Sequence, residues 1–263
     1  MLINFTLAPI ESIVPWGEPG NHSLHWFGLT YGEYWIQAGD AALFEYSEHA
    51  RNAGVNRYCD YQVVRLYEDL LDMLPYILEP VPEPLAPYIS GESAKAWRNA
   101  YHAWCDSDDD IADADYLGAI GDAAVAWSER RRLDSAYLSP SANIAIWSDR
   151  EHVHIEWDNR DRLFDGKPAW SALLGAYRMP RDRFIEETRS FHVRLMDQMA
   201  ARVDRVVSDG LPSGIHIDLP GLVREHGQRT GSLDTALQVA IPPTDWQRSE
   251  RAIREILAAQ GRV

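Results

Sequence analysis

The chain has 263 residues, 46% hydrophobic and 25% charged, a composition that excludes a disordered or fibrous protein. Forty acidic and 25 basic residues give a net charge of −15, which argues against nucleic acid or an anionic membrane as a partner. Because no run of about 18 apolar residues occurs, residues 1–5 carry no basic charge and only two cysteines are present, we expect a cytoplasmic protein without a signal peptide.

Residues 1–78 are predicted to form strands and then a helix. Residues 2–8 alternate apolar and polar side chains, as a strand does, and a turn rich in proline and glycine follows. Short β-rich runs separated by turns predict an antiparallel meander over residues 23–30, 34–38 and 42–46. From Tyr61 the apolar spacing changes to three and four, which predicts an amphipathic helix that ends or bends near Pro75.

The middle of the chain is predicted to be an extended connector followed by helices. Residues 79–87 contain four prolines, which favour a stiff, extended segment. Aromatic residues at helical spacing, from Trp97 to Trp104, mark one helix, and Leu117 to Trp127 mark a second. Between these helices lies an acidic cluster formed by Asp106, Asp108, Asp109, Asp110, Asp113 and Asp115.

Strand-type patterning returns at residues 142–178 and is followed by helices. Residues 152–157 alternate strictly, and residues 169–177 are predicted to form the third strand of this block. The longest helix is predicted after Pro180, with one apolar stripe about 25 residues long. The tail is predicted to contain a helix near residues 219–226 and a last helix that Thr244 caps.

Strands and helices therefore come in blocks rather than in strict alternation. This order favours an α+β fold in which two antiparallel meanders are each followed by a long amphipathic helix, and it argues against a doubly wound nucleotide-binding fold. We expect one domain over residues 1–210, with sub-lobes at 1–78 and 141–210, and a helical C-terminal extension over 211–263 packed on it.

Standard motifs for nucleotides, hydrolase serines and calcium are missing or incomplete. The sequence contains no Gly-x-Gly-x-x-Gly, no P-loop and no Gly-x-Ser-x-Gly, so it predicts no cofactor. The acidic cluster begins like a calcium loop at Asp106, but Ile111 and Leu117 replace the required glycine and glutamate.

The strand at residues 152–157 carries the best metal candidates. His152, His154 and Glu156 share one face of the strand and resemble two histidines and a carboxylate around one cation. The alternative is that they form the solvent-facing side of a hairpin, with Val153, Ile155 and Trp157 in the core, and we favour this alternative.

Two groups of residues are candidates for binding a ligand or a partner. The first is the polar segment that follows the strand at residues 152–157. Its arginines can hold a carboxylate or phosphate of a ligand. The alternative is a loop whose acidic and basic side chains pair with each other. The second is a set of aromatic and imidazole side chains, of which one in each neighbouring pair is expected to face outward. The candidate residues are Asp158, Asn159, Arg160, Asp161, Arg162, His25, Trp26, Tyr34, Trp35, His154 and Trp170. Cys59 is a further candidate nucleophile, if His25 or His154 lies beside it.

The charge is distributed unevenly along the chain. Residues 1–140 hold 22 acidic and 8 basic residues, a net charge of −14, whereas residues 141–263 hold 18 and 17, a net charge of −1. The acidic cluster is either a solvated turn that keeps the protein soluble or a surface that attracts a basic protein partner by electrostatic steering.

Several segments, taken in order, resemble a family of uncharacterised actinobacterial proteins that has no established activity. They are Pro15-Trp-Gly17, Leu24-His-Trp-Phe-Gly-Leu-Thr30, Tyr34-Trp35, Val64-Arg-Leu66, residues 68–71, residues 153–163, Gly166 with Pro168 and Trp170, and Phe191-His192 with Leu195-Met196. The resemblance covers about residues 3–208. It implies no catalytic residue, because no activity is attached to the family.

The sequence leaves three functions open. We favour an acidic, cytosolic protein-binding protein without catalytic activity, of the kind exemplified by immunity proteins and antitoxins. The first alternative is an enzyme of unrecognised type whose pocket would be lined by His25, His154, Asp158, Arg160 and Asp161. The second alternative is a small-molecule sensor that uses the same pocket. The oligomeric state is left open.

Overall fold

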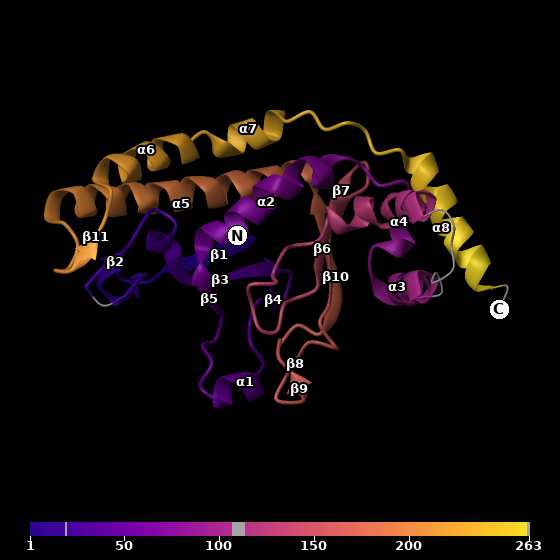
Figure 1. Cartoon of the computed structure of the whole chain (residues 1–263), viewed down its shortest axis with the longest axis horizontal. Helices are drawn as coiled ribbons and strands as arrows, with labels where there is room; N and C mark the ends of the chain where they lie inside the picture. The colour runs from indigo at the N-terminus through magenta and orange to yellow at the C-terminus, as the bar shows by residue number, and fades with distance from the viewer. Residues whose placement is uncertain (19, 107–113, 262–263) are drawn as a thin grey trace.

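The computed structural model describes residues 1–18, 20–106 and 114–261. It confirms the mixed α+β class, with antiparallel sheets in the middle of an elongated molecule and helices along one side and at one end (Figure 1). Within the described residues, none of the helices combines the length and the apolar character needed to span a bilayer.

The first sheet is built around one long strand. Strand β3 (Tyr31–Ala38) pairs antiparallel with β1 (Ile3–Leu7), β4 (Ala41–Leu43) and β5 (Cys59–Gln62). Burial alternates along β3, because the residues of its inner face pack in the main core while those of its outer face, Trp35 among them, are only half-buried. Gly32 permits the close approach of β1, since a Cβ at this position would lie 2.2 Å from the Thr6 carbonyl oxygen.

The strand predicted over residues 23–30 is wrong. Only β2 (His22–Ser23) is extended there, paired in parallel with β11 (Ile215–His216), and residues 28–30 form the 3-10 helix η2 (Gly28–Thr30). Gly28, Leu29 and Thr30 are buried consecutively, which a strand with one wet face does not allow. The predicted turn at residues 31–33 is instead the start of β3.

The second sheet has the order β10-β7-β6, and all its pairs are antiparallel. Its strands are β6 (Ile144–Ser148), β7 (His152–Asp158) and β10 (Leu174–Pro180). The third strand starts at Leu174 rather than at residue 169, because Ala169 and Trp170 are buried consecutively in the core instead of alternating. Residues 163–168 before it form a small hairpin of β8 (Leu163–Phe164) and β9 (Lys167–Pro168).

The main core lies between the first sheet, one face of the second sheet and two long helices. These helices are α2 (Val63–Leu78) and α5 (Arg181–Asp209), which contact β3, β6, β1 and β10. Helix α2 continues three residues past Pro75, and this extra turn buries Ile77. The remaining elements around this core are η1 (Ile10–Ser12), α1 (Glu48–Asn52), α6 (Leu219–Arg229) and α7 (Ser232–Gln238).

A second core lies at the opposite end of the molecule (Figure 1). It is formed by α3 (Gly91–Asp106), α4 (Ala114–Glu129) and α8 (Trp246–Gln260), joined by η3 (Ala86–Tyr88) and by the outer face of β6. Trp97, Trp127, Trp147 and Ile256 are buried in it. The C-terminal segment is thus divided, because α6 and α7 pack on α5 and α2 while α8 packs on α3 and α4.

A buried ion pair ties this second core to the proline-rich connector. The fully buried Arg131 donates from Nη2 to Glu79 Oε2 over 2.9 Å, and Thr244 donates to the same carboxylate from N and Oγ1 over 2.7 and 2.6 Å. Thr244 is therefore not the cap that the sequence predicts. Asp245 caps α8 instead, accepting from the backbone N–H of Arg248 over 3.0 Å.

Candidate functional site

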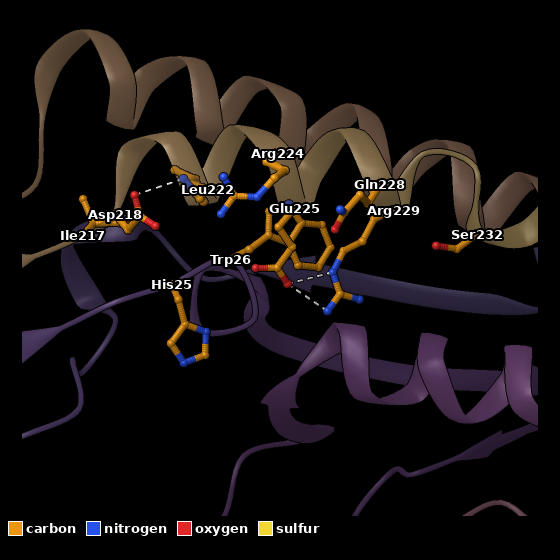
Figure 2. A pocket seen from close by; sticks show the side chains of 11 residues that line it. His25, Trp26, Ile217, Asp218, Leu222, Arg224, Glu225, Gln228, Arg229 and Ser232 are labelled. Atoms are coloured by element: carbon orange, nitrogen blue, oxygen red, sulfur yellow. Dashed lines mark hydrogen bonds and ion pairs between the residues drawn. The ribbon is translucent and has the colours of Figure 1, made fainter.

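A cleft of about 600 Å³ lies between the segment at His25 and helix α6 (Figure 2). Helix α6 begins where Asp218 accepts a hydrogen bond from the N–H of Gly221 over 3.0 Å, with a proline in the first turn. Its face toward the cleft carries Arg224, Glu225 and Arg229, and Figure 2 shows His25 and Trp26 on the opposite wall.

Part of this lining is occupied by internal contacts. Arg229 is held by Glu225 over 2.9 Å and by Glu68 over 2.7 Å, and its guanidinium lies 4.3 Å from the centroid of a Trp26 ring. Trp26 is fully buried and donates from Nε1 to His226 Nδ1 over 3.3 Å. Burial lowers the pKa of His226, and this agrees with Nδ1 acting as an acceptor.

Other side chains of the cleft remain available to a ligand. His25, Arg224 and Gln228 are exposed, and Arg224 makes no ion pair within the described residues. The predicted residues His25 and Trp26 thus line one cleft with helix α6, which lies about 200 residues later in the sequence. No local pattern in the sequence signals Arg224 or Arg229, because their place in the cleft depends on the packing of α6 on α5.

Tyr34 and Trp35 point to opposite sides of the first sheet, as expected of neighbours on a strand. Tyr34 is fully buried and its hydroxyl lies 2.9 Å from that of Tyr137, so the structure places it in the core and not at a binding surface. Trp35 lies on the outer face, where its ring stacks on Tyr58 at 4.1 Å and Arg57 lies over Tyr58. This half-exposed pair is the aromatic part of the outer face.

Strand β7 buries Val153, Ile155 and Trp157, as the alternation predicts. Its other face is half-buried rather than wet, because β7 is the central strand of its sheet and not part of an edge hairpin. Burial raises the pKa of Glu156 on this face. The polar face of β7 is therefore partly covered by other parts of the protein and is not a solvent-facing surface.

The metal site suggested for His152, His154 and Glu156 is not formed. In the part of the chain that the structure describes, no three metal-ligating side chains come together. His154 instead places Nε2 2.8 Å from Asp149 Oδ2 and stacks on Trp147 at 4.1 Å. Residues two apart on a strand are separated by about 6.6 Å, so the three side chains would have to turn toward one another to share an ion. The hydrogen bond to Asp149 instead turns His154 away from the other two.

Asp149 is strongly held in its charged form. Burial raises the pKa of this carboxyl, but hydrogen bonds from the backbone N–H groups of His152 and Glu151 and from the His154 side chain lower it to about 2. The turn between β6 and β7 is thus stabilised by its own carboxylate.

The polar segment after β7 satisfies its own charges. Arg160 donates to both oxygens of Asp158 over 2.8 Å and to Glu92 over 2.6 Å, and the first of these contacts lowers the pKa of Asp158. Asp161 pairs with Lys95 at 3.3 Å. These contacts join the segment to helix α3 and favour the structural alternative over a ligand site.

The remaining members of the predicted set are also part of the packing. Asn159 is buried and bridges the backbone of Asn143 and Ala172 over 2.7 and 3.0 Å. Arg162 is half-buried, and its carbonyl accepts from the N–H of Ala169. Trp170 is buried and stacks on Tyr46 at 4.4 Å, which removes it from any surface role.

Two further predictions concern reactive or charged groups. Cys59 is buried beside Tyr34 rather than beside a histidine, and burial raises the pKa of its thiol to about 12, so it is not an activated nucleophile. In the acidic cluster Asp106 is exposed. Asp108, Asp109, Asp110 and Asp113 lie outside the described residues, as does the side chain of Asp115.

The five residues suggested for a catalytic pocket are not brought to one place. His25 lines the α6 cleft, His154 pairs with Asp149, and Asp158, Arg160 and Asp161 are tied to helix α3. An enzyme built on this set would need His25 beside β7, whereas β2 and β7 lie far apart along the molecule (Figure 1).

Comparison with known proteins places the chain in a family. The family of unknown function DUF5984 matches residues 2–252. The chain belongs to this family. The matched range includes both sheets, the main core and the α6 cleft, and it ends within α8 of the second core. No curated protein and no solved structure matches the chain.

Proposed function

We propose that this member of DUF5984 binds a basic protein partner and catalyses nothing by itself, in the manner of an immunity protein or an antitoxin. The charge asymmetry supports this proposal, with −14 on residues 1–140 and −1 on the remainder. A few net charges suffice for solubility, so this excess has room for a second role. The proposal places the protein in the cytoplasm and in the actinobacterial branch that its motifs resemble.

The observation that carries the proposal is the state of the basic side chains in the first 140 residues. Five of the eight are already in ion pairs within the described residues, namely Arg57, Arg65, Lys95, Arg131 and Arg132. Arg130 lies over the Tyr76 ring. Glu11, Glu68 and Glu92 also pair with arginines of the second half, but the net charge of residues 1–140 stays at −14, and a basic protein surface is the complementary partner.

The test is capture of a partner from the native cell, followed by association kinetics at increasing salt. We expect the association rate to fall steeply with salt, because exposed charges are screened beyond about 8–10 Å near physiological ionic strength. Replacing Asp108, Asp109 and Asp110 together with Asn should slow association and leave the free energy of unfolding nearly unchanged. No captured protein, or a complex insensitive to both changes, would refute the proposal.

A second candidate function is sensing of a small molecule in the α6 cleft. The exposed His25 and the unpaired Arg224 on a cleft of about 600 Å³ favour this alternative, because such a volume suits a metabolite. A metabolite screen by thermal shift checks it. A hit that Arg224→Ala abolishes would support the sensor, and stabilisation that persists in this variant would place the molecule elsewhere.

A further inference from the structure

A cavity at the edge of the second core has no role in the function proposed above. It measures about 960 Å³ and is bounded by the proline-rich connector, the turn between β6 and β7 and the first residue of α8. Two tryptophans, Trp147 and Trp246, line it together with Glu83 and Glu151. This volume is at the upper end of what ligand sites enclose, so side chains of a partner can enter it.

The charges on the cavity wall are of two kinds. Glu79 is committed to Arg131 and Thr244, and Asp149 is committed to the turn and to His154. In contrast, Glu83 and Glu151 are exposed, and neither carboxylate forms an ion pair or hydrogen bond within the described residues. The only basic side chain in the lining is the exposed Arg150, so the available charge is predominantly negative.

Two residues of the cavity wall, Glu79 and Trp246, already hold one guanidinium group behind the cavity, that of the fully buried Arg131. Arg131 lies 5.2 Å from the centroid of a Trp246 ring while its Nη2 donates to Glu79 over 2.9 Å. A carboxylate beside a tryptophan face is a combination that holds arginine in a defined position, by ion pairing and by cation–π attraction within about 6 Å. At the exposed side, Glu83 and Glu151 line the same cavity as Trp147 and Trp246, so carboxylates and tryptophans are again present together.

We infer that this cavity receives an arginine side chain of the basic protein partner, between the tryptophans and the carboxylates of Glu83 and Glu151. The inference rests on the proposed function and adds to it the docking position and the chemistry of the contacting residue. Arginine fits better than lysine, because its planar guanidinium stacks on an aromatic ring while donating to a carboxylate. The proline-rich connector presents Glu83 on a stiff segment, which reduces the entropy lost on binding.

The experiment uses the full-length protein and a blocked tetra-arginine peptide, with tetra-lysine and tetra-glutamine peptides as references. Binding is measured by calorimetry, and the position is read from the indole N–H signals of Trp246 and Trp35 in a nitrogen-15 spectrum, assigned with W246F and W35F. We expect tetra-arginine to shift the Trp246 signal, tetra-lysine to bind more weakly and tetra-glutamine not to bind.

The matched variants change the charge equally at two places. E83Q/E151Q should weaken tetra-arginine binding by about fivefold, the effect of losing two exposed charge contacts. The control E18Q/E48Q removes two exposed carboxylates away from the cavity and should change the affinity by less than about twofold. Equal weakening in both variants, a shift of Trp35 instead of Trp246, or no binding at millimolar peptide would overturn the inference.

An experiment with the native partner distinguishes failure of this inference from failure of the proposed function. A captured partner that binds wild type and E83Q/E151Q equally would keep the proposed function and refute the cavity as its docking position. Failure to capture any partner, with tetra-arginine still shifting Trp246, would refute the proposed function and leave an arginine-binding cavity.

Discussion

The two large sheets carry the same period-two pattern and yet have different surroundings. Along β3 of the first sheet, burial alternates, and the outer residue Trp35 stays half-exposed. In β6 of the second sheet all five residues are buried, because the main core covers one face and the α3-α4-α8 lobe covers the other. Alternation therefore decides which residues share a face, whereas the packing of other elements decides whether that face meets water.

This difference determines where a partner can bind. The outer face of the first sheet keeps the stacked Trp35 and Tyr58 rings accessible, whereas on the second sheet Trp147 and His154 stack beneath a lobe of helices. Where that lobe ends, the cavity at Trp246 and Glu83 remains open. Five substitutions, two of them with a matched control, test this comparison.

The largest effect is expected at the inner face of the second sheet. Trp157→Ala should lower the free energy of unfolding by about 3–5 kcal/mol, because Trp157 is 6% exposed and its removal leaves a cavity in the main core. Chemical denaturation of the variant beside wild type measures this loss. A loss below about 1 kcal/mol would mean that the second sheet does not pack on the main core as described.

Substituting the outer-face tryptophan of each sheet, Trp147 and Trp35, compares the surroundings of the two sheets directly. Trp147→Ala is expected to cost about 3 kcal/mol and Trp35→Ala about 1 kcal/mol, because Trp147 is 6% exposed under the helical lobe and Trp35 is only half-buried. The same denaturation experiment ranks them. Equal costs, or the reverse order, would show that the lobe does not cover the second sheet.

A glycine in β10 tests how closely that edge strand approaches the core. A Cβ on Gly175 would lie 2.4 Å from Cζ2 of Trp157, so Gly175→Ala should cost about 1–3 kcal/mol through overpacking. The matched control is Gly118→Ala in α4, where a Cβ meets nothing within 4 Å, and the change should stabilise by about 0.5–1 kcal/mol. Both changes in the free energy of unfolding are measured from the denaturation midpoints. An unchanged stability in Gly175→Ala would contradict the close approach of residue 175 to the Trp157 ring.

A pH-dependent effect is expected at Asp69 in α2, the helix that contacts both sheets. Burial raises the pKa of Asp69 to about 7, and its Oδ2 has no hydrogen-bond partner among the described residues. The folded state then binds more protons than the unfolded state between about pH 4 and 7, so this group makes stability fall as pH rises through that window.

Asp69→Asn should remove this dependence, flattening the stability profile by at most about 1.4 kcal/mol per pH unit between pH 4 and 7. Denaturation midpoints over that range give the slope. Asp72→Asn, on the half-exposed side of the same helix, is the control and should keep the wild-type slope. An unchanged slope in Asp69→Asn would mean that Asp69 titrates near its ordinary pKa.

Local patterns predicted the elements with strong periodicity. The alternation around Val153 and Trp157, the helix after Pro180 and the helices around Trp97 and Trp127 are confirmed, because burial of one face needs a fixed spacing in each. The prediction at residues 23–30 is wrong, since its apolar residues are buried consecutively in a turn and a 3-10 helix. Thr244 is misplaced as a cap because Glu79, far away in sequence, takes its hydrogen bonds.

By itself the sequence determined the α+β class, the faces of the strands and the concentration of negative charge in the first half, since these follow from spacing and composition. Tertiary structure alone decided that α8 joins α3 and α4, that the polar face of β7 is covered, and that α6 meets His25. Contacts between segments more than 100 residues apart depend on how buried faces pair with one another. Many pairings satisfy the same local pattern, and only complementary packing selects one.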